Sequence, residues 1–160
     1  MRYSKSRALF IFLAAVPFVL SNGCSLLGRP DRVCFQRRCI DVQVARKEAE
    51  LRQGLKNRTF LPEDEGMLFI FPETGRNDFW MQDTLIPLDI IWFDEKYDVV
   101  YIASSLPPCI SSPCPTYGPG ESSRYVLEIS AGRAERLGIK IGDHAEHQKG
   151  RPARFPLAAR

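Results

Sequence analysis

The sequence predicts a mainly β protein, a compact β-sandwich or distorted barrel with one or two short helices. Short apolar or alternating segments recur along the chain between Gly, Pro and charged residues, whereas helix-forming segments are few. Apolar residues make up 44% of the 160 residues, a share typical of a globular protein. We find no internal repeat in the sequence, so we expect a single domain with one core of modest size.

The first half of this domain is expected to contain three strands and one helix. Apolar and polar residues alternate over residues 40–44, which predicts a strand with one solvated face. Residues 46–53 favour a helix that ends at Gly54. The apolar run at 66–71 is too short for a helix and predicts a buried strand, and residues 78–82 predict a shorter strand.

The second half begins with two strands, 88–93 and 99–103, that a polar turn joins into a hairpin. Residues 106–120 hold five prolines and predict a long loop, which is uncommon unless it is functional. A strand at 125–129 and a short helix at 133–137 follow before the chain closes the domain.

The N-terminal residues 1–23 are predicted to be a signal peptide. Three basic residues precede an apolar stretch at 8–20, which is shorter than the roughly 20 residues that span a bilayer; an uncleaved membrane anchor is the alternative. After cleavage we expect a tether over 24–38, one globular domain over 39–148 and a disordered basic tail over 149–160.

The segment Ser21-Asn22-Gly23-Cys24 resembles the box at which bacterial lipoproteins are cleaved and acylated on the cysteine. Ser21 stands where that box usually has leucine. Ser21 and Gly23 also satisfy the rule of ordinary signal peptidase, so ordinary cleavage is the alternative. Acylation of Cys24 would anchor the protein to a membrane of the bacterial cell envelope.

Lipidation of Cys24 would leave four cysteines, an even number that suits disulfide formation in an oxidising compartment. They form two equally spaced couples, Cys34 with Cys39 and Cys109 with Cys114. Pairing within each couple is the simplest of the three possible connectivities. The alternative, a four-thiolate metal site, lacks the two-residue gap of zinc-binding couples.

The chain gives no positive sign of a cofactor, a metal or a nucleic acid as partner. Residues 24–160 carry equal numbers of basic and acidic residues, because the whole excess of positive charge precedes Cys24. The sequence contains no Gly-rich phosphate loop and no Gly-x-Ser-x-Gly turn for a nucleophile. His144 and His147 lack a nearby third ligand, so we interpret them as solvated polar residues.

The segment around Trp80 is the strongest candidate for a binding site. Strand alternation places Trp80 on the opposite face from Phe79 and Met81, so at least one large apolar side chain is expected to be exposed; burial of all three is the alternative. With Asp83 and Thr84 beside it, Trp80 suits the binding of a flat ring that polar neighbours orient. The predicted ligand-binding set also includes Arg58, Asp89 and Tyr117.

Asp89 and Glu128 each interrupt an otherwise apolar strand. A carboxylate among apolar neighbours is either paired or has a raised pKa, and two such groups are candidates for the acid and base of a hydrolase. The alternative is that Arg58 or a backbone amide satisfies each carboxylate and that both fix the strand register.

Several short motifs in fixed order resemble the bacterial and archaeal family called "domain of unknown function 192", over about residues 39 to 147. The motifs are Gly54-Leu55 with Arg58 and Leu61, Gly66-Met67-Leu68-Phe69 with Phe71, Phe79-Trp80-Met81 with Thr84, Pro87-Leu88-Asp89, Val126-Leu127-Glu128 with Gly132, and Gly142-Asp143. Lys56 stands where the family commonly has methionine. The resemblance implies a compact, mainly β fold that is often exported, and it brings no established activity.

These observations favour a lipid-anchored, non-catalytic binding module of the cell envelope that takes a small polar ligand or a partner protein. One alternative is an envelope hydrolase that acts on carbohydrate or cell-wall material through Asp89 and Glu128. A structural lipoprotein whose surface serves only assembly is the third possibility.

Overall fold

The computed structural model describes residues 28–151, so the predicted signal peptide, Cys24 and most of the predicted tail lie outside it. No helix within the described residues is long and apolar enough to cross a membrane. The elements are β1 (Asp31–Phe35), β2 (Arg38–Ala45), α1 (Glu48–Gln53), β3 (Glu65–Gly75), β4 (Phe79–Trp80), β5 (Leu88–Phe93), β6 (Val99–Leu106), β7 (Thr116–Tyr117), β8 (Ser123–Ser130), α2 (Arg133–Leu137) and β9 (Glu146–Gln148).

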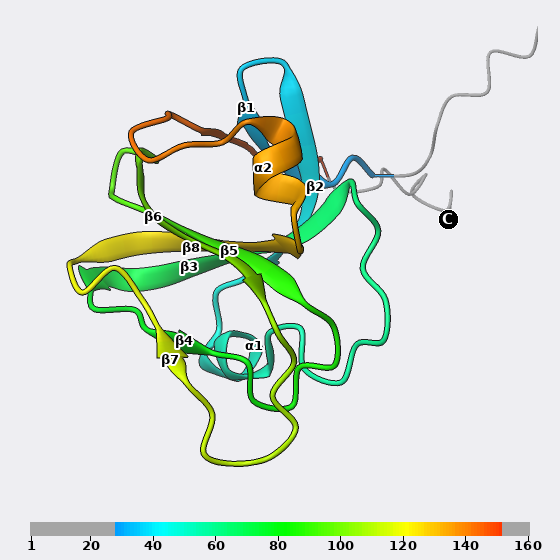
Figure 1. Ribbon diagram of the computed structural model, residues 1–160. Coiled ribbons are helices and arrows are strands. Elements are labelled where there is room, and N and C mark those ends of the chain that lie inside the picture. Colours follow the sequence, from blue (N-terminus) through cyan, green and yellow to red (C-terminus); the bar gives the residue numbers. More distant parts are fainter. Residues whose placement is uncertain (1–27, 152–160) are drawn as a thin grey trace, which may run out of the picture.

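Seven of the strands form one sheet in the order β6-β5-β8-β3-β2-β1-β9, and β4 pairs with β7 in a small second sheet. β2 and β3 are parallel, while the other neighbouring strands are antiparallel. Figure 1 shows α2 on one side of the central strands and α1 with the β4–β7 pair on the other. The sheet does not close into a barrel, so the sandwich-like form of the prediction is confirmed.

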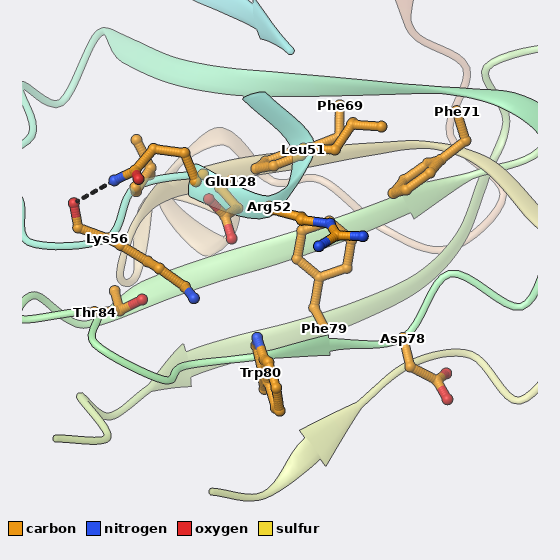
Figure 2. A pocket seen from close by; sticks show the side chains of 13 residues that line it. Leu51, Arg52, Lys56, Phe69, Phe71, Asp78, Phe79, Trp80, Thr84 and Glu128 are labelled. Carbon is orange, nitrogen blue, oxygen red and sulfur yellow. Dashed lines mark hydrogen bonds between the residues drawn. The ribbon is translucent and has the colours of Figure 1, made fainter. Parts of the chain in front are cut away.

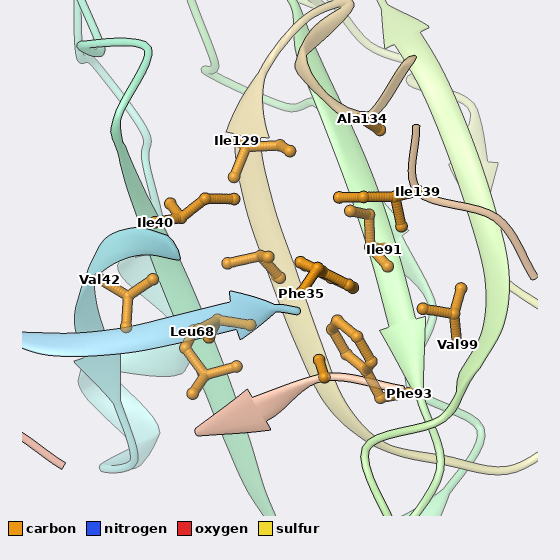
Figure 3. Packing of buried hydrophobic residues seen from close by; sticks show 13 residues of the cluster. Phe35, Ile40, Val42, Leu68, Ile91, Phe93, Val99, Ile129, Ala134 and Ile139 are labelled. Carbon is orange, nitrogen blue, oxygen red and sulfur yellow. The ribbon is translucent and has the colours of Figure 1, made fainter. Parts of the chain in front are cut away.

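The central sheet divides the core into two clusters because successive side chains of a strand point to opposite faces. On β5, Ile91 and Phe93 join the first cluster, whereas Ile90 and Trp92 join the second. Figure 3 shows the first cluster, which α2 helps to cover. The rings of Phe35 and Phe93 lie 6.1 Å apart although three strands separate β1 from β5, so the sheet curls around this cluster.

The expected tether over 24–38 is wrong for residues 31–38, because the sheet already begins at Asp31. β1 pairs with β2 through a two-residue turn, and the Cys34–Cys39 disulfide links directly opposite residues of this hairpin. Val33 is fully buried, so β1 contributes to the hydrophobic core. The charged residues around this short apolar core concealed the strand in the sequence.

The C-terminal end of the described chain is fixed to the same edge. β9 pairs with β1, and His147 is buried, contrary to the expectation that it is solvated. Its Nε2 lies 2.8 Å from Asp31 Oδ2, and the Gly150 N–H donates to Asp31 Oδ1. Partial burial alone would raise the pKa of Asp31, but these bonds and the His147 charge lower it below its usual value. Residues 149–151 of the predicted tail are therefore still tied to the domain.

Asp89 holds the start of α2 against β5. Its side chain is fully buried, Oδ1 accepts hydrogen bonds from the N–H groups of Ser105 (2.8 Å) and Gly132 (3.0 Å), and Oδ2 accepts one from Ala134 (2.8 Å). No side chain caps α2 from its own N-cap position, which Gly132 occupies in a left-handed conformation. Asp89 therefore satisfies these amides from a neighbouring strand, and the structural interpretation of this carboxylate is confirmed.

We expect Asp89→Asn to lower the free energy of unfolding by about 2–4 kcal/mol, because the new NH₂ group must face a buried N–H donor. Urea unfolding followed by tryptophan fluorescence measures the change. Asp64→Asn, at an exposed position, is the matched control and should leave stability within about 0.5 kcal/mol of wild type. Equal stability of the Asp89 variant and wild type would contradict the anchoring role.

Candidate functional site

A cleft of about 560 Å³ opens on the face of the sheet that carries the second core cluster. Figure 2 shows its side chains, which come from the segment 51–56, from β3, β4 and β8, and from the turn after β4. The lining of this cleft combines several aromatic rings with one buried carboxyl group. The lining residues are Leu51, Arg52, Gln53, Gly54, Leu55, Lys56, Phe69, Phe71, Asp78, Phe79, Trp80, Thr84 and Glu128.

One side of the cleft is the connection between β2 and β3. Parallel neighbours cannot be joined by a tight hairpin, so residues 46–64 cross one face of the sheet. α1 begins at the N-cap Lys47, where the Glu50 side chain accepts the backbone N–H, and ends at Gly54. Gly54 has φ +49°, and a Cβ there would lie 3.3 Å from the Phe69 ring. Glycine thus allows this backbone to approach the inside of the cleft closely.

Glu128 lies at the floor of the cleft. Its neighbours on β8 point to the first cluster, while Glu128 shares its face with the cross-strand partner Ile90 on β5. Its side chain is only 5% exposed, and Oε2 has no hydrogen-bond partner among residues 28–151. Desolvation by burial raises the pKa of Glu128 to about 8, so this carboxyl group is mainly protonated at neutral pH.

Aromatic side chains line the same cleft as this carboxyl group. The Phe79 ring meets the Phe69 ring edge to face, with centroids 4.9 Å apart, and also contacts Trp92 in the core. Trp80 is 52% exposed while Met81 is buried, so the predicted alternation at this segment is confirmed. Trp80 therefore presents its ring at the opening of the cleft rather than in the core.

Lys56 reaches across the opening from the crossover segment. Its Nζ lies 5.8 Å from the centroid of the Trp80 ring and 4.0 Å from Asp83 Oδ2. The Asn57 N–H donates to the Asp83 carbonyl at 2.8 Å, which ties this segment to the turn after β4. Arg52, the other cation of the lining, pairs with Glu48 on the outer surface of α1.

The long loop predicted at 106–120 supports the Trp80 segment from behind. Its Cys109–Cys114 disulfide forms within the couple, as does Cys34–Cys39, so the simplest connectivity is confirmed. The backbone of Cys109 accepts a hydrogen bond from the Asp83 N–H (3.0 Å) and donates one to Met81 O (3.3 Å). β7 in the same loop pairs with β4, so the disulfide-closed loop holds one edge of the cleft.

The structure brings only part of the predicted site together. Trp80, Thr84 and Glu128 line the cleft, whereas Arg58, Asp83, Asp89 and Tyr117 do not. Arg58 donates to the Gln43 side chain, and Tyr117 lies opposite Phe79 in the β4–β7 pair and packs against the second core cluster. Asp89 and Glu128 project from opposite faces of the sheet and cannot act together on one substrate.

The residues that sequence reasoning missed are chiefly Lys56 and Arg52. Both lie on the crossover, which a linear pattern cannot place against β4 and β8. Lys56 had one visible signal, since it replaces the methionine that is common at this position in the family it resembles. No group of three or more His, Cys, Asp or Glu in the described range is placed to hold a metal ion.

Comparisons with known proteins agree with this fold. The DUF192 family pattern, described as "Uncharacterized ACR", matches residues 32–147. A "putative transcription regulator" from Sinorhizobium meliloti 1021 is 29% identical with a TM-score of 0.67, over 75% of this chain and 93% of its own. A protein of unknown function from Novosphingobium aromaticivorans DSM 12444 is 36% identical, also with a TM-score of 0.67, over 78% and 89%. No curated protein sequence matches the chain.

We expect the stability of the protein to fall as the pH rises from 5 to 7 on account of Glu128. Burial raises its pKa from 4.5 to about 8, so the folded state binds more protons than the unfolded state in this range. Glu128→Gln removes this dependence. The free energy of unfolding of wild type should therefore fall by about 2 kcal/mol relative to that of the variant as the pH rises from 5 to 7. Urea unfolding at several pH values measures it.

The matched control for this experiment is Glu121→Gln, at an exposed position. This variant should keep the pH profile of the wild-type protein. Parallel profiles for wild type and Glu128→Gln would show that Glu128 is solvated or paired in the folded state.

Proposed function

We propose that this chain, which belongs to the DUF192 family, is an exported binding protein of the bacterial cell envelope that takes a small ligand in the cleft above Glu128. It is held to a membrane by lipid on Cys24 and has a non-catalytic role. The observation that carries the binding role is the buried carboxyl group of Glu128 at the floor of an aromatic cleft, where Oε2 has no hydrogen-bond partner within the described part of the chain.

Export is supported from two independent directions. The basic and apolar leader before Cys24 is typical of a signal peptide, and the two disulfides of the described domain favour an oxidising compartment. With the sheet beginning at Asp31, residues 25–30 alone would separate a lipidated Cys24 from the domain. The domain would then work close to the membrane surface.

Binding of a small molecule explains the cleft better than the other candidate roles do. A polar group left unpaired in a buried position costs free energy, and a ligand that hydrogen-bonds Glu128 would recover it. The volume of about 560 Å³ falls in the range of small-molecule sites, whereas a protein partner would need a larger contact surface. The hydrolase alternative loses its carboxylate pair, because Asp89 is committed to backbone amides on the other face.

The anchor is tested by Cys24→Ser in cells that export the protein. We expect wild type in the membrane fraction, with a mature N-terminus at an acylated Cys24, and the variant in the soluble envelope fraction or uncleaved. Cell fractionation measures the location of the protein, and mass spectrometry identifies its N-terminus and any acyl group. Ser25→Ala is the control and should fractionate as wild type does. A wild-type protein released without lipid would contradict the anchor.

Ligand binding is tested by a thermal-shift screen of residues 25–160 against envelope metabolites, amino acids and glycans. A ligand at about 100 times its dissociation constant should add about 2.7 kcal/mol of stability. Trp80→Ala should reduce the shift from such a ligand while the variant stays folded, because Trp80 lines the opening and half of its surface is already exposed.

Phe60→Ala is the matched control for this experiment. Phe60 is also a large exposed aromatic residue, but it does not line the cleft. Hits that respond equally to both substitutions bind elsewhere. A broad library without a single hit that depends on Trp80 would overturn the binding role, and capture of a protein partner through Trp80 would replace it with a docking role.

A further inference from the structure

The cleft holds acidic and basic groups at different depths. Glu128 lies at the floor, while Lys56 and Arg52 lie on the crossover segment at the opening. Asp78 is the other charged residue of the lining, and it already pairs with Arg76 at 2.8 Å. The cleft therefore offers a free carboxyl group inside and two cations outside.

The floor is suited to a positively charged hydrogen-bond donor. Glu128 lacks a partner for Oε2, and no salt bridge joins it to a cation of the described chain. An ammonium group there would gain a charge-assisted hydrogen bond, which is about twice as strong as a neutral one. Phe69 lines the same cleft, and an aromatic ring can attract a cation through its face.

The opening is suited to an anion. Lys56 Nζ is held by Asp83 only at 4.0 Å, and its side chain is 26% exposed. Arg52 is exposed on α1 and is bound by a single surface carboxylate, a kind of ion pair that contributes little stability. Both cations can therefore turn toward a carboxylate without breaking a buried interaction.

We propose that the ligand is a small zwitterion of the amino-acid type, with its ammonium group on Glu128, its carboxylate near Lys56 and Arg52, and its apolar body against Phe79 and Trp80. This inference rests on the proposed binding function and deepens it by naming the class of ligand. It uses each ionisable group of the lining that lacks a strong partner. A neutral sugar or a purely anionic ligand would leave Glu128 without a positively charged partner.

Binding of such a ligand is coupled to a proton. The ammonium group favours the ionised form of Glu128, so the carboxyl proton leaves to solvent when the ligand binds. Affinity should therefore rise with pH from 6 to 8. The other charged groups that face this space are Lys56, Arg52 and Asp78.

The experiment uses probes that share one apolar body and differ in the charged groups that they carry. L-Phenylalanine carries both groups, phenethylamine only the amine, 3-phenylpropionate only the acid, and N-acetylphenylalanine amide neither. A second series with an isobutyl body, from leucine, isopentylamine and 4-methylpentanoate, covers a smaller apolar part. Calorimetric titration of the folded chain over pH 6–8 gives affinities and, in two buffers, the protons released.

We expect the zwitterion of at least one series to bind most tightly. Glu128→Gln should weaken the zwitterion and the amine by about tenfold or more, abolish the pH dependence and leave the acid unchanged. Lys56→Met, of similar length, should weaken the zwitterion and the acid but not the amine. This double pattern separates a charge-specific contact from general damage to the cleft.

The result that overturns the zwitterion is equally distinct. Tighter binding of the acid or of the neutral probe, or an amine affinity that Glu128→Gln does not change, contradicts it while the binding function stands. If neither probe series binds but a library compound binds in a way that depends on Trp80, the zwitterion is likewise contradicted and the binding function stands. Failure of both series and of the whole library overturns the proposed function as well.

Discussion

The register between β5 and β8 is the constraint on which the two faces of this protein depend. Asp89 lies opposite Ile129, and Glu128 lies opposite Ile90, so the two carboxyl groups are offset by one residue. Because strand side chains alternate, this offset sends them to opposite sides of the sheet. One side uses its carboxylate to fix a helix, and on the other side a carboxyl oxygen has no partner among residues 28–151.

Much of the fold could be predicted because its signals are local. The apolar run in β3 and the hairpin of β5 and β6 are confirmed, and the predicted helix at 133–137 has the same bounds as α2. β1 could not be predicted in this way. Its apolar part is three residues long between charged ones, and only pairing with β2 and β9 makes it a strand.

The candidate site was predictable only where alternation decides the outcome. The exposure of Trp80 and the burial of Glu128 follow from their positions in apolar segments. The hydrogen-bond partners of Asp89 could not be predicted from the sequence, because α2 and Ser105 are brought to it from distant parts of the chain. Lys56 also could not be placed, since the path of a crossover depends on the parallel pairing of the strands that it joins.

That parallel pairing has a consequence for how the family could diversify. Any connection between β2 and β3 must pass over the same side of the sheet, so its length and composition can change while the strands beneath it stay in register. Residues 51–56 supply about half of the cleft lining from this single stretch. Exchanging residues 46–64 between homologues while keeping Leu55 and Leu61, which belong to the second core cluster, would thus transfer ligand selectivity as one segment.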